Sequence, residues 1–390
     1  MKTQVLIIGG GPSGLLLSQL LMKEGIETVV LEKQSREHVL SRIRAGVIEP
    51  NSVELLGYAG VGERIKAEGH SHSGTILSAG DKSLRIDFEA TTKKNVTVFG
   101  QTEITKDLYN AQDKLNARIL HNIKDVLLND LEGGSPKVNF QTASGNKVTI
   151  TSDFIVGCDG FHGVSRSYIP NDVKKIYEKI YPFGWLGILS ETPPVNEELI
   201  YANSASGFAL ASMRNENLSR YYIQCPSNTK VEDINDEMFW KELKMRLPKK
   251  YAETLVTGPS IEKSIAPLRS FVCEPIQWGN LFLVGDAAHI VPPTGAKGLN
   301  LAFADVYYLS TAIKDFYSDG SKSLLSSYSE IALKRIWKTV RFSWWLTSLL
   351  HTFPSSSDFE RKLQISEIEY LSESLKAQAT LAENYVGLPY

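Results

Sequence analysis

The stretch Gly9-Gly10-Gly11-Pro12-Ser13-Gly14 combines residue types and a spacing that suit phosphate binding. Its glycines follow the G-x-G-x-x-G pattern. In such a turn the first glycine permits a tight bend, the second lets a pyrophosphate approach the backbone, and the third lets a helix pack closely on a strand. Backbone N–H groups at the start of the following helix would then bind the phosphates.

The residues around this turn supply the elements that such a site needs. Val5–Ile8 is an apolar run of strand length, Leu15–Leu21 can form a buried helix, and Thr28–Leu31 reads as a second strand that ends at Glu32. A carboxylate about 20 residues after the glycines suits ribose hydroxyls and repels a 2'-phosphate. The expected ligand is therefore the ADP half of FAD or NAD. A tight turn without a ligand is the weaker explanation.

Two later segments also run from an apolar strand into an acid. Phe154–Gly157 precedes Cys158-Asp159-Gly160, and Leu281–Val284 precedes Gly285-Asp286. Either could be a second nucleotide contact, although the first would be a routine strand end if it stood alone.

Other candidate anion contacts are two arginines and a helix start. Arg42 and Arg44 lie close to the glycine turn, where guanidinium forks match phosphate oxygens, but they could also be solvated charges. A helix is expected from Leu299 onward, with Gly298 at its N-terminus. N–H donors and the positive end of the helix dipole would there suit an anionic ring.

Residues 181–222 alternate aromatic and aliphatic with small or polar residues, which predicts an antiparallel sheet. By their period-two relations, Ser212, Arg214 and Tyr222 can project from one face, with Tyr201 from a neighbouring segment. One arginine among hydroxyls on an apolar wall suits an aromatic carboxylate. An ordinary sheet surface is the alternative.

Composition excludes several function classes. The chain has 390 residues, 42% of them apolar, enough for two or three domains. Its formal net charge of -2 provides no basic face, so nucleic acid and anionic membranes are not expected partners. There is no apolar run of about 18 residues and no secretory signal, and a cytoplasmic location is expected.

Metal and disulfide chemistry are not expected. Cys158, Cys225 and Cys273 are odd in number and lack metal-ligand spacing, which favours reduced, buried thiols. His70 and His72 are paired in sequence without a nearby third ligand, which favours a structural role for them.

The glycine turn with Glu32, Cys158-Asp159-Gly160 through Arg166, and Gly285-Asp286-Ala287-Ala288-His289 with Pro292-Pro293 occur in an order that resembles the FAD-dependent aromatic hydroxylases. Segments 41–46, 158–163, 181–187, 292–300 and 383–389 are similar to the members that act on 4-hydroxybenzoate, and the resemblance covers essentially the whole chain. It implies a flavoprotein monooxygenase of aromatic catabolism that uses FAD, NADPH and O2 to convert 4-hydroxybenzoate to 3,4-dihydroxybenzoate.

The resemblance also implies an α/β fold with three parts and a homodimer. A Rossmann-like FAD-binding domain would comprise residues 1–70, 98–177 and 268–318. An interleaved antiparallel-sheet substrate domain would comprise residues 71–97 and 178–267, and residues 319–390 would form a helical C-terminal region.

Residue roles follow from the resemblance position by position. The substrate carboxylate would meet Ser212, Arg214 and Tyr222, and its phenol would meet Tyr201 and the carbonyl of Pro293, with Tyr385 and His72 continuing a proton chain. The nicotinamide nucleotide would meet His162, Arg166 and Arg269, together with Arg44, Lys33, Gln34 and His38, although Glu37 opposes a 2'-phosphate and leaves NADH open. The expected FAD contacts are Gly9, Gly11, Ser13, Gly14, Glu32, Arg42, Arg44, Gln101, Asp159, Arg220, Asp286, Gly298, Leu299 and Asn300.

These roles make chemical sense. Electrophilic hydroxylation needs an electron-rich ring, and a phenolate is richer than a phenol. Tyr201, with a reference pKa of about 10, would relay the proton, and His72, with a reference pKa near 6.5, would exchange it with solvent near neutrality. Two alternatives stay open: a sister hydroxylase acting on another aromatic acid such as an aminobenzoate, and a flavoprotein without hydroxylase activity.

Overall fold

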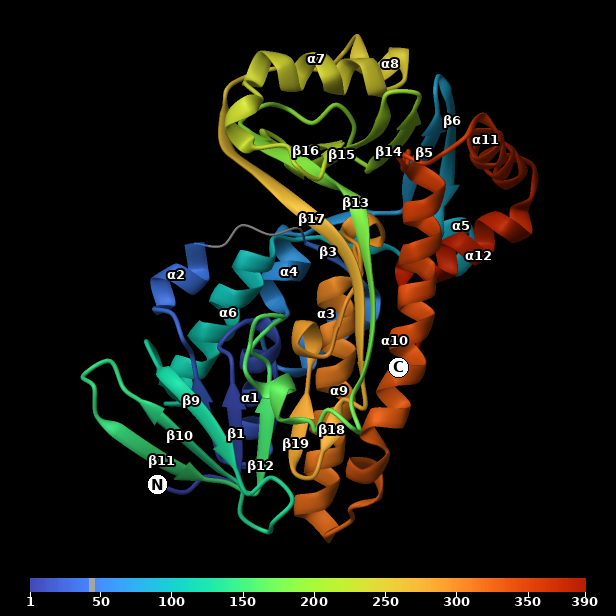
Figure 1. Ribbon diagram of the computed structural model, residues 1–390. Helices are drawn as coiled ribbons and strands as arrows, with labels where there is room; N and C mark the ends of the chain where they lie inside the picture. Colours follow the sequence, from blue (N-terminus) through green and yellow to red (C-terminus); the bar gives the residue numbers. More distant parts are fainter. Residues whose placement is uncertain (42–45) are drawn as a thin grey trace.

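The glycine turn belongs to a six-stranded sheet in the order β18-β19-β12-β1-β2-β8 (Figure 1). The computed structural model describes residues 1–41 and 46–390. The strands are β1 (Val5–Ile8), β2 (Thr28–Leu31), β8 (Arg118–Leu120), β12 (Phe154–Gly157), β18 (Gln277–Trp278) and β19 (Leu281–Leu283). All pairings are parallel except that of β18 with β19. Strands β1, β2 and β12 are buried along their whole length, as expected for a parallel sheet covered on both faces.

Helix α1 (Pro12–Lys23) packs against α6 (Gln101–Lys114) and α9 (Gly298–Asp319) beside this sheet. A separate antiparallel meander is formed by β9 (Lys124–Asn129), β10 (Lys137–Gln141) and β11 (Lys147–Thr151). The β1–α1–β2 unit and the helix beginning at Gly298 confirm the sequence-based expectation.

The second large sheet has eight strands in the order β20-β17-β13-β16-β15-β14-β5-β6. They are β5 (Gly74–Ala79), β6 (Lys82–Asp87), β13 (Lys175–Ser190), β14 (Ile200–Ser204), β15 (Gly207–Asn215), β16 (Leu218–Pro226), β17 (Ser260–Glu274) and β20 (His289–Ile290). The predicted antiparallel sheet is confirmed with one difference, because β5 and β14 pair in parallel. No short turn joins these two strands, so their relative direction is not constrained by a hairpin.

Strands β13 and β17 are the longest in the molecule and run from beside the parallel sheet up into the eight-stranded sheet (Figure 1). The boundaries expected at 177/178 and 267/268 therefore fall inside continuous strands. The three-part division stays a prediction, and these two strands physically link two of its parts.

Residues 36–98 also contain several short elements before and after β5 and β6. They are α2 (Arg36–Ser41), β3 (Val47–Ile48), α3 (Pro50–Tyr58), α4 (Glu63–Glu68), β4 (His70–His72), α5 (Phe88–Thr92) and β7 (Val96–Val98). Helices α3 and α4 are separate rather than one continuous helix. Gly60 adopts φ +81°, a left-handed conformation that ends α3, and α4 starts three residues later.

The eight-stranded sheet is covered on both faces. One face packs on α7 (Asp236–Arg246) with α8 (Lys249–Ala252) nearby, and the other packs on α10 (Ser323–Leu350), α11 (Asp358–Glu373) and α12 (Leu375–Val386). The described residues also form the 3-10 turns η1 (Ser165–Tyr168), η2 (Val231–Asp233), η3 (Gly285–Ala287) and η4 (Pro293–Gly295). Among the described residues, no helix is long and apolar enough to cross a membrane.

Candidate active site

The glycine turn has a geometry that other residues could not adopt. Gly9 has φ +111°, and a Cβ there would lie 2.2 Å from the Cys158 carbonyl oxygen. A Cβ on Gly14 would lie 2.0 Å from the carbonyl oxygen of Gly9. By contrast, a Cβ on Gly11 would meet no described atom within 4 Å. The turn is closed where the protein packs on itself and open at Gly11, the N-cap of α1, where the pyrophosphate is expected.

Glu32 is held against the back of this turn. Its Oε2 accepts a hydrogen bond from the Gly10 N–H at 2.6 Å, and its Oε1 accepts one from the Gln34 N–H at 2.7 Å. Both oxygens keep further lone pairs, so an oriented carboxylate stands where a ribose would follow the phosphates. The open turn and this carboxylate fit the adenosine half of FAD.

Asp159 lies at the end of β12, directly beside the turn. Its Oδ2 accepts hydrogen bonds from the Ser165 N–H and hydroxyl, both at 2.9 Å, while its Oδ1 is buried without a partner in the described part of the chain. Burial raises the pKa of this carboxyl. A Cβ on Gly163 would lie 2.1 Å from the Asp159 Cγ, so the position requires glycine.

A second open helix start occurs at α9. A Cβ on Gly298 would meet no described atom within 4 Å, which leaves room for a ring at this N-terminus. The next residue is Leu299, and Asn300 follows with both side-chain atoms engaged. Its Oδ1 accepts from the Glu49 N–H and its Nδ2 donates to the Val47 carbonyl, both at 2.9 Å.

Asp305 is a site residue that the sequence analysis missed. Its Oδ2 accepts from the Gly285 N–H at 2.9 Å and contacts Nε2 of His289 at 2.6 Å, which fixes the turn that carries Asp286. The available signal was a lone acid within the apolar helix run from Leu301 to Ile313. Gln101 is the first residue of α6, and Ser13 lies in the first turn of α1. Arg42 and Arg44 lie outside the described residues.

The candidate substrate residues share one face of the eight-stranded sheet. Leu210 pairs with Tyr201 on one side and with Tyr222 on the other, and Ser212 pairs with Arg220. Opposed residues point to the same face and alternate residues along a strand do too. We call the set Tyr201, Ser212, Arg214 and Tyr222 the substrate face.

Arg214 is the charged member of the substrate face. Its Nε is buried without a hydrogen-bond partner, and the described residues offer this guanidinium no ion pair. Burial lowers its pKa, while the Tyr222 phenol and the Glu262 carboxylate act in the opposite direction. A half-buried cation without a counter-ion at hydrogen-bond distance favours an anionic ligand group here.

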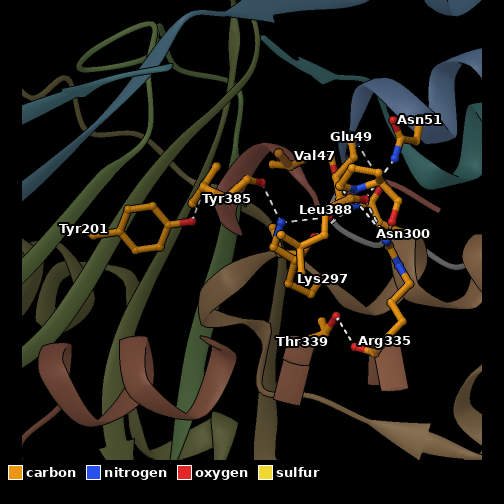
Figure 2. Close-up of polar contacts among 12 residues, drawn as sticks. Val47, Glu49, Asn51, Tyr201, Lys297, Asn300, Arg335, Thr339, Tyr385 and Leu388 are labelled. Atoms are coloured by element: carbon orange, nitrogen blue, oxygen red, sulfur yellow. Dashed lines mark hydrogen bonds and ion pairs between the residues drawn. The ribbon is translucent and has the colours of Figure 1, made fainter. Parts of the chain in front are cut away.

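Tyr201 and Tyr385 meet through their hydroxyls at 2.8 Å (Figure 2). They come from β14 and α12, and both rings are almost fully buried. Phe88 stacks on Tyr385 with ring centroids 4.8 Å apart. Burial raises the pKa of both phenols, that of Tyr385 to about 12, so both are neutral near pH 7 and suit relaying a proton rather than removing one as strong bases.

His72 and Pro293 are placed less directly. His72 is 3% exposed, and its two ring nitrogens have no partner among the described residues. Burial lowers its pKa to about 4, so the value near 6.5 used for the sequence-based expectation does not hold in this fold. Within the described structure, therefore, no hydrogen bond joins His72 to Tyr385. The Pro293 carbonyl accepts one hydrogen bond, from the Ala296 N–H at 2.9 Å, and keeps a second lone pair.

Arg220 lies over the Tyr222 ring, with its guanidinium carbon 5.1 Å from the centroid. It pairs with Glu262 at 2.9 Å and donates to the Ser264 hydroxyl at 3.0 Å. A Cβ on Gly187 would lie 2.5 Å from the Tyr222 ring, so this glycine makes room for the ring and the arginine. In this conformation Arg220 is anchored beside the substrate face.

The expected nicotinamide-nucleotide residues form two groups that do not touch within the described structure. Arg166 donates to the carbonyls of Phe161 and Ala287, while Arg269 pairs with Glu178 at 3.1 Å and lies 4.4 Å from the Phe161 ring centroid. His162 is exposed next to that ring. The other group, Lys33, Gln34 and His38, follows β2, where neighbouring Arg36 is already engaged by Asp113 at 2.7 Å.

Comparison with known proteins agrees with this arrangement. Residues 2–343 match the model of a family described as FAD binding domain. The chain belongs to this FAD-binding family. A p-hydroxybenzoate hydroxylase from Acinetobacter baylyi is 54% identical over 391 aligned residues, which cover 100% of this chain and 96% of that protein. A 6-hydroxy-3-succinoylpyridine 3-monooxygenase from Pseudomonas putida is 25% identical, covering 82% of this chain and 81% of its own length.

A solved structure, that of p-nitrophenol 4-monooxygenase from Pseudomonas putida, superposes with a TM-score of 0.84 at 17% identity and covers 100% of both chains. It shares the fold of this FAD-binding chain. These findings confirm the resemblance noted in the sequence, the α/β fold with a Rossmann-type FAD domain, and the enzyme class, a FAD-dependent monooxygenase. FAD as cofactor, with a nicotinamide nucleotide as co-substrate, is likewise confirmed.

Proposed function

We propose that the protein hydroxylates 4-hydroxybenzoate at the ring carbon ortho to its phenol group, giving 3,4-dihydroxybenzoate. The observation that carries this proposal is that the sheet face brings together a half-buried guanidinium at Arg214, whose Nε is buried without a partner in the described structure, and the Tyr201 hydroxyl, which is bonded to that of Tyr385 on α12. A para-phenol carboxylate offers one matching group to each. The 54% identical relative named p-hydroxybenzoate hydroxylase supports the same substrate.

Arg214 would bind the substrate carboxylate and supply the counter-charge that its site lacks. Tyr222 and Ser212 bring hydroxyls to the same face. Charge-assisted hydrogen bonds to a planar carboxylate fix the orientation of a ring as well as its affinity. The aromatic body would lie along the apolar wall of the sheet, where the Trp185 and Tyr222 rings stand 5.3 Å apart.

At the other end of the substrate, the Tyr201 hydroxyl would accept a hydrogen bond from the neutral phenol or donate one to the phenolate oxygen. A proton that leaves the phenol can pass through Tyr201 to Tyr385, because their hydroxyls are already 2.8 Å apart. His72, neutral above pH 4 in this fold, would receive it through its free ring nitrogens, with solvent bridging the remaining gap. The Pro293 carbonyl would accept a hydrogen bond from the substrate phenol through its second lone pair.

The residues that would hold FAD are those of the two open helix starts. Gly9, Gly11, Ser13, Gly14 and Glu32 would bind the adenosine and pyrophosphate half, and Gly298, Leu299 and Asn300 the ring, with Gln101, Asp159, Asp286, Arg220, Arg42 and Arg44 as further contacts. Bound FAD would take up the reducing equivalents of the nicotinamide nucleotide and use them to activate O2. The protein orients the ring, moves the phenol proton and excludes water.

The nicotinamide nucleotide is proposed to be NADPH, with NADH as the alternative. Lys33, Gln34 and His38, with Arg44, would receive the 2'-phosphate region, and His162, Arg166 and Arg269 the remainder. Comparing kcat/KM for both nucleotides checks this choice, and a higher value for NADH would contradict it.

Assembly and location are part of the proposal. The C-terminal helices expose apolar side chains, including Phe359 at 70%, Leu363 at 54% and Leu375 at 76%, which a second copy of the chain would cover. We expect a cytoplasmic homodimer without nucleic-acid or membrane partners. Sizing by light scattering at low micromolar concentration checks the dimer, and a monomer at all concentrations would refute it.

The test of the reaction is NADPH oxidation by FAD-loaded protein with and without 4-hydroxybenzoate, with chromatography of the aromatic product and an assay for peroxide. Strong acceleration with 3,4-dihydroxybenzoate formed in proportion is the expected result. Acceleration that yields mainly peroxide would mean that the true substrate is another aromatic acid, such as an aminobenzoate. No acceleration by any aromatic acid would contradict the assignment of the substrate face.

A further inference from the structure

Next to Tyr385, three charged side chains that the sequence did not single out form a buried cluster (Figure 2). Nζ of Lys297 donates to Oε1 of Glu49 at 2.7 Å, and Nη2 of Arg335 contacts Oε2 of the same carboxylate at 3.4 Å. The side chains are at most 7% exposed. Such clusters are weak evidence for stability, because desolvation opposes the Coulomb attraction, so their geometry invites a search for another role.

The cluster grips the end of the chain. Nη1 of Arg335 donates to the carbonyls of Leu388 at 2.6 Å and Pro389 at 2.8 Å, and its guanidinium carbon lies 5.0 Å from the Tyr390 ring centroid. Nδ2 of Asn51 donates to the same Leu388 carbonyl at 3.0 Å. We call residues 387–390 the C-terminal tail.

The tail packs directly on Glu49. Gly387 has φ +98°, and a Cβ there would lie 2.0 Å from the Glu49 Oε2. The tail therefore leaves α12 in a conformation that only glycine adopts without strain, with its backbone against the carboxylate that Lys297 and Arg335 share.

Tyr385 lies between the substrate face and the charged cluster of Glu49, Lys297 and Arg335, which we call the clamp. Nζ of Lys297 donates to its backbone carbonyl at 2.5 Å, two residues before the tail begins, while its hydroxyl meets that of Tyr201. The position of the Tyr385 hydroxyl is thus set from both sides: by ring packing against Phe88, and by the anchoring of the backbone that follows it.

We infer that Arg335 is a positioning residue for the proton relay: by clamping the C-terminal tail at Leu388 and Pro389, it holds the Tyr385 hydroxyl within hydrogen-bond distance of Tyr201. This inference rests on the proposed function. Arg335 acts through two backbone carbonyls and a tyrosine, and no group of the substrate needs to touch it.

The fork of the guanidinium matters because one Nη atom spans two carbonyls while the other reaches Glu49. A lysine keeps the charge but offers a single point donor. Releasing the tail would let the last turn of α12 move, and a hydrogen bond weakens steeply once its donor and acceptor separate. The phenol of a bound substrate would then lose its proton less readily.

The experiment is a spectrophotometric pH titration of 4-hydroxybenzoate bound to FAD-loaded protein, since phenol and phenolate differ in absorbance, together with kcat and KM against pH. We compare wild type with Arg335→Lys, Arg335→Met and Asn51→Ala. The matched control is Arg341→Met, because Arg341 lies on the same helix and contacts Asn384 at an exposed position rather than the tail.

We expect both Arg335 variants to raise the apparent pKa of the bound phenol by about one unit, and Asn51→Ala by about half a unit. At a pH below the phenol pKa, kcat would fall about tenfold in the Arg335 variants and recover as pH rises, since one unit is a tenfold change in the ionised fraction. KM for 4-hydroxybenzoate would change less than about twofold, because Arg214 is untouched, and Arg341→Met would behave as wild type.

Two results would overturn the positioning role. If Arg335→Lys matches wild type while Arg335→Met is shifted, the charge matters and the clamp does not. If Arg335→Lys and Asn51→Ala both titrate as wild type, the tail does not position the relay, even where Arg335→Met fails to fold. A wild-type protein that leaves the phenol pKa at its value in free solution would instead contradict the proposed function itself, which separates the two failures.

Discussion

The glycine turn and the Tyr201–Tyr385 relay are built in opposite ways. The turn uses backbone from one continuous stretch, and its requirement is for the absence of side chains at Gly9 and Gly14. The relay uses two side chains that lie 184 residues apart in sequence and depend on burial, with an ionic clamp behind one of them. Steric changes should therefore break the first, and changes of proton affinity should break the second.

The largest effect is expected at Gly14. In Gly14→Ala the new Cβ would lie 2.0 Å from the Gly9 carbonyl oxygen, and relieving this overlap would require the backbone of the turn to move. We expect loss of FAD binding and a fall of about 3 kcal/mol in the free energy of unfolding, measured by flavin titration and urea unfolding.

Gly11→Ala separates ligand binding from folding in the same turn. Its Cβ has open space, so the free energy of unfolding of the FAD-free protein should fall by no more than about 1 kcal/mol, the cost of alanine at an N-cap, while FAD affinity falls at least about tenfold. Gly57→Ala, also with open space but on α3, is the control: it should leave FAD affinity unchanged and, if anything, raise the free energy of unfolding by up to about 1 kcal/mol. Normal FAD affinity in Gly11→Ala would contradict the site.

A smaller effect is expected at the substrate carboxylate. Arg214→Met should raise the Kd for 4-hydroxybenzoate about ten- to a hundredfold, since hydrogen bonds to charged groups contribute about 1.5–3 kcal/mol. The matched ligand is 4-hydroxybenzyl alcohol, which lacks the carboxylate and should bind both proteins alike. Equal losses for both ligands, measured by flavin absorbance titration, would mean that the sheet face had been disrupted generally.

Tyr385→Phe keeps the ring that stacks on Phe88 and removes only the relay hydroxyl. We expect kcat near neutral pH to fall about tenfold and to recover at higher pH, where the phenol ionises without assistance. FAD affinity should stay at the wild-type value. A pH-independent loss of kcat would indicate a structural defect rather than a broken relay.

The smallest effect concerns His351, which packs against Trp185 and Phe208 on the same side of the sheet as the substrate face. Its ring stacks between Phe183 and Phe208, its Nε2 accepts from Trp185 Nε1 at 2.7 Å, and burial lowers its pKa to about 3. Between pH 6.5 and 3 the unfolded chain binds a proton here that the folded chain does not, so stability falls as pH decreases, by at most about 1.4 kcal/mol per pH unit.

His351→Gln should therefore flatten the dependence of unfolding free energy on pH between 6 and 4.5, as measured by urea unfolding. The free energy of unfolding of this variant at pH 7, compared with that of wild type, measures the packing lost through the substitution itself. A slope identical to wild type would show that His351 does not remain neutral in the folded protein. His72, lowered to about 4, should contribute a similar slope that persists in this variant.

The predictability of each region follows from its construction. The turn with Glu32 could be predicted because each glycine, the strand and the acid leave a local signal in one stretch. The shared face of Ser212, Tyr222 and Tyr201 was also accessible, because strand alternation assigns faces before the pairing is known.

The clamp and the proton affinities could not be predicted. Glu49, Lys297 and Arg335 come from three distant segments, and each alone resembles a solvated charge. The pKa of His72 depends on burial, which a reference value omits. Both features depend on contacts between residues far apart in the sequence, which local sequence patterns do not reveal.

The most direct test of the account is the pKa of the phenol of 4-hydroxybenzoate bound to FAD-loaded wild type and Tyr201→Phe, measured by absorbance against pH. The account predicts that wild type lowers this pKa below its value in free solution and that Tyr201→Phe abolishes the lowering while the carboxylate still binds at Arg214. An unchanged phenol pKa in wild type, or the same lowering in both proteins, would contradict it.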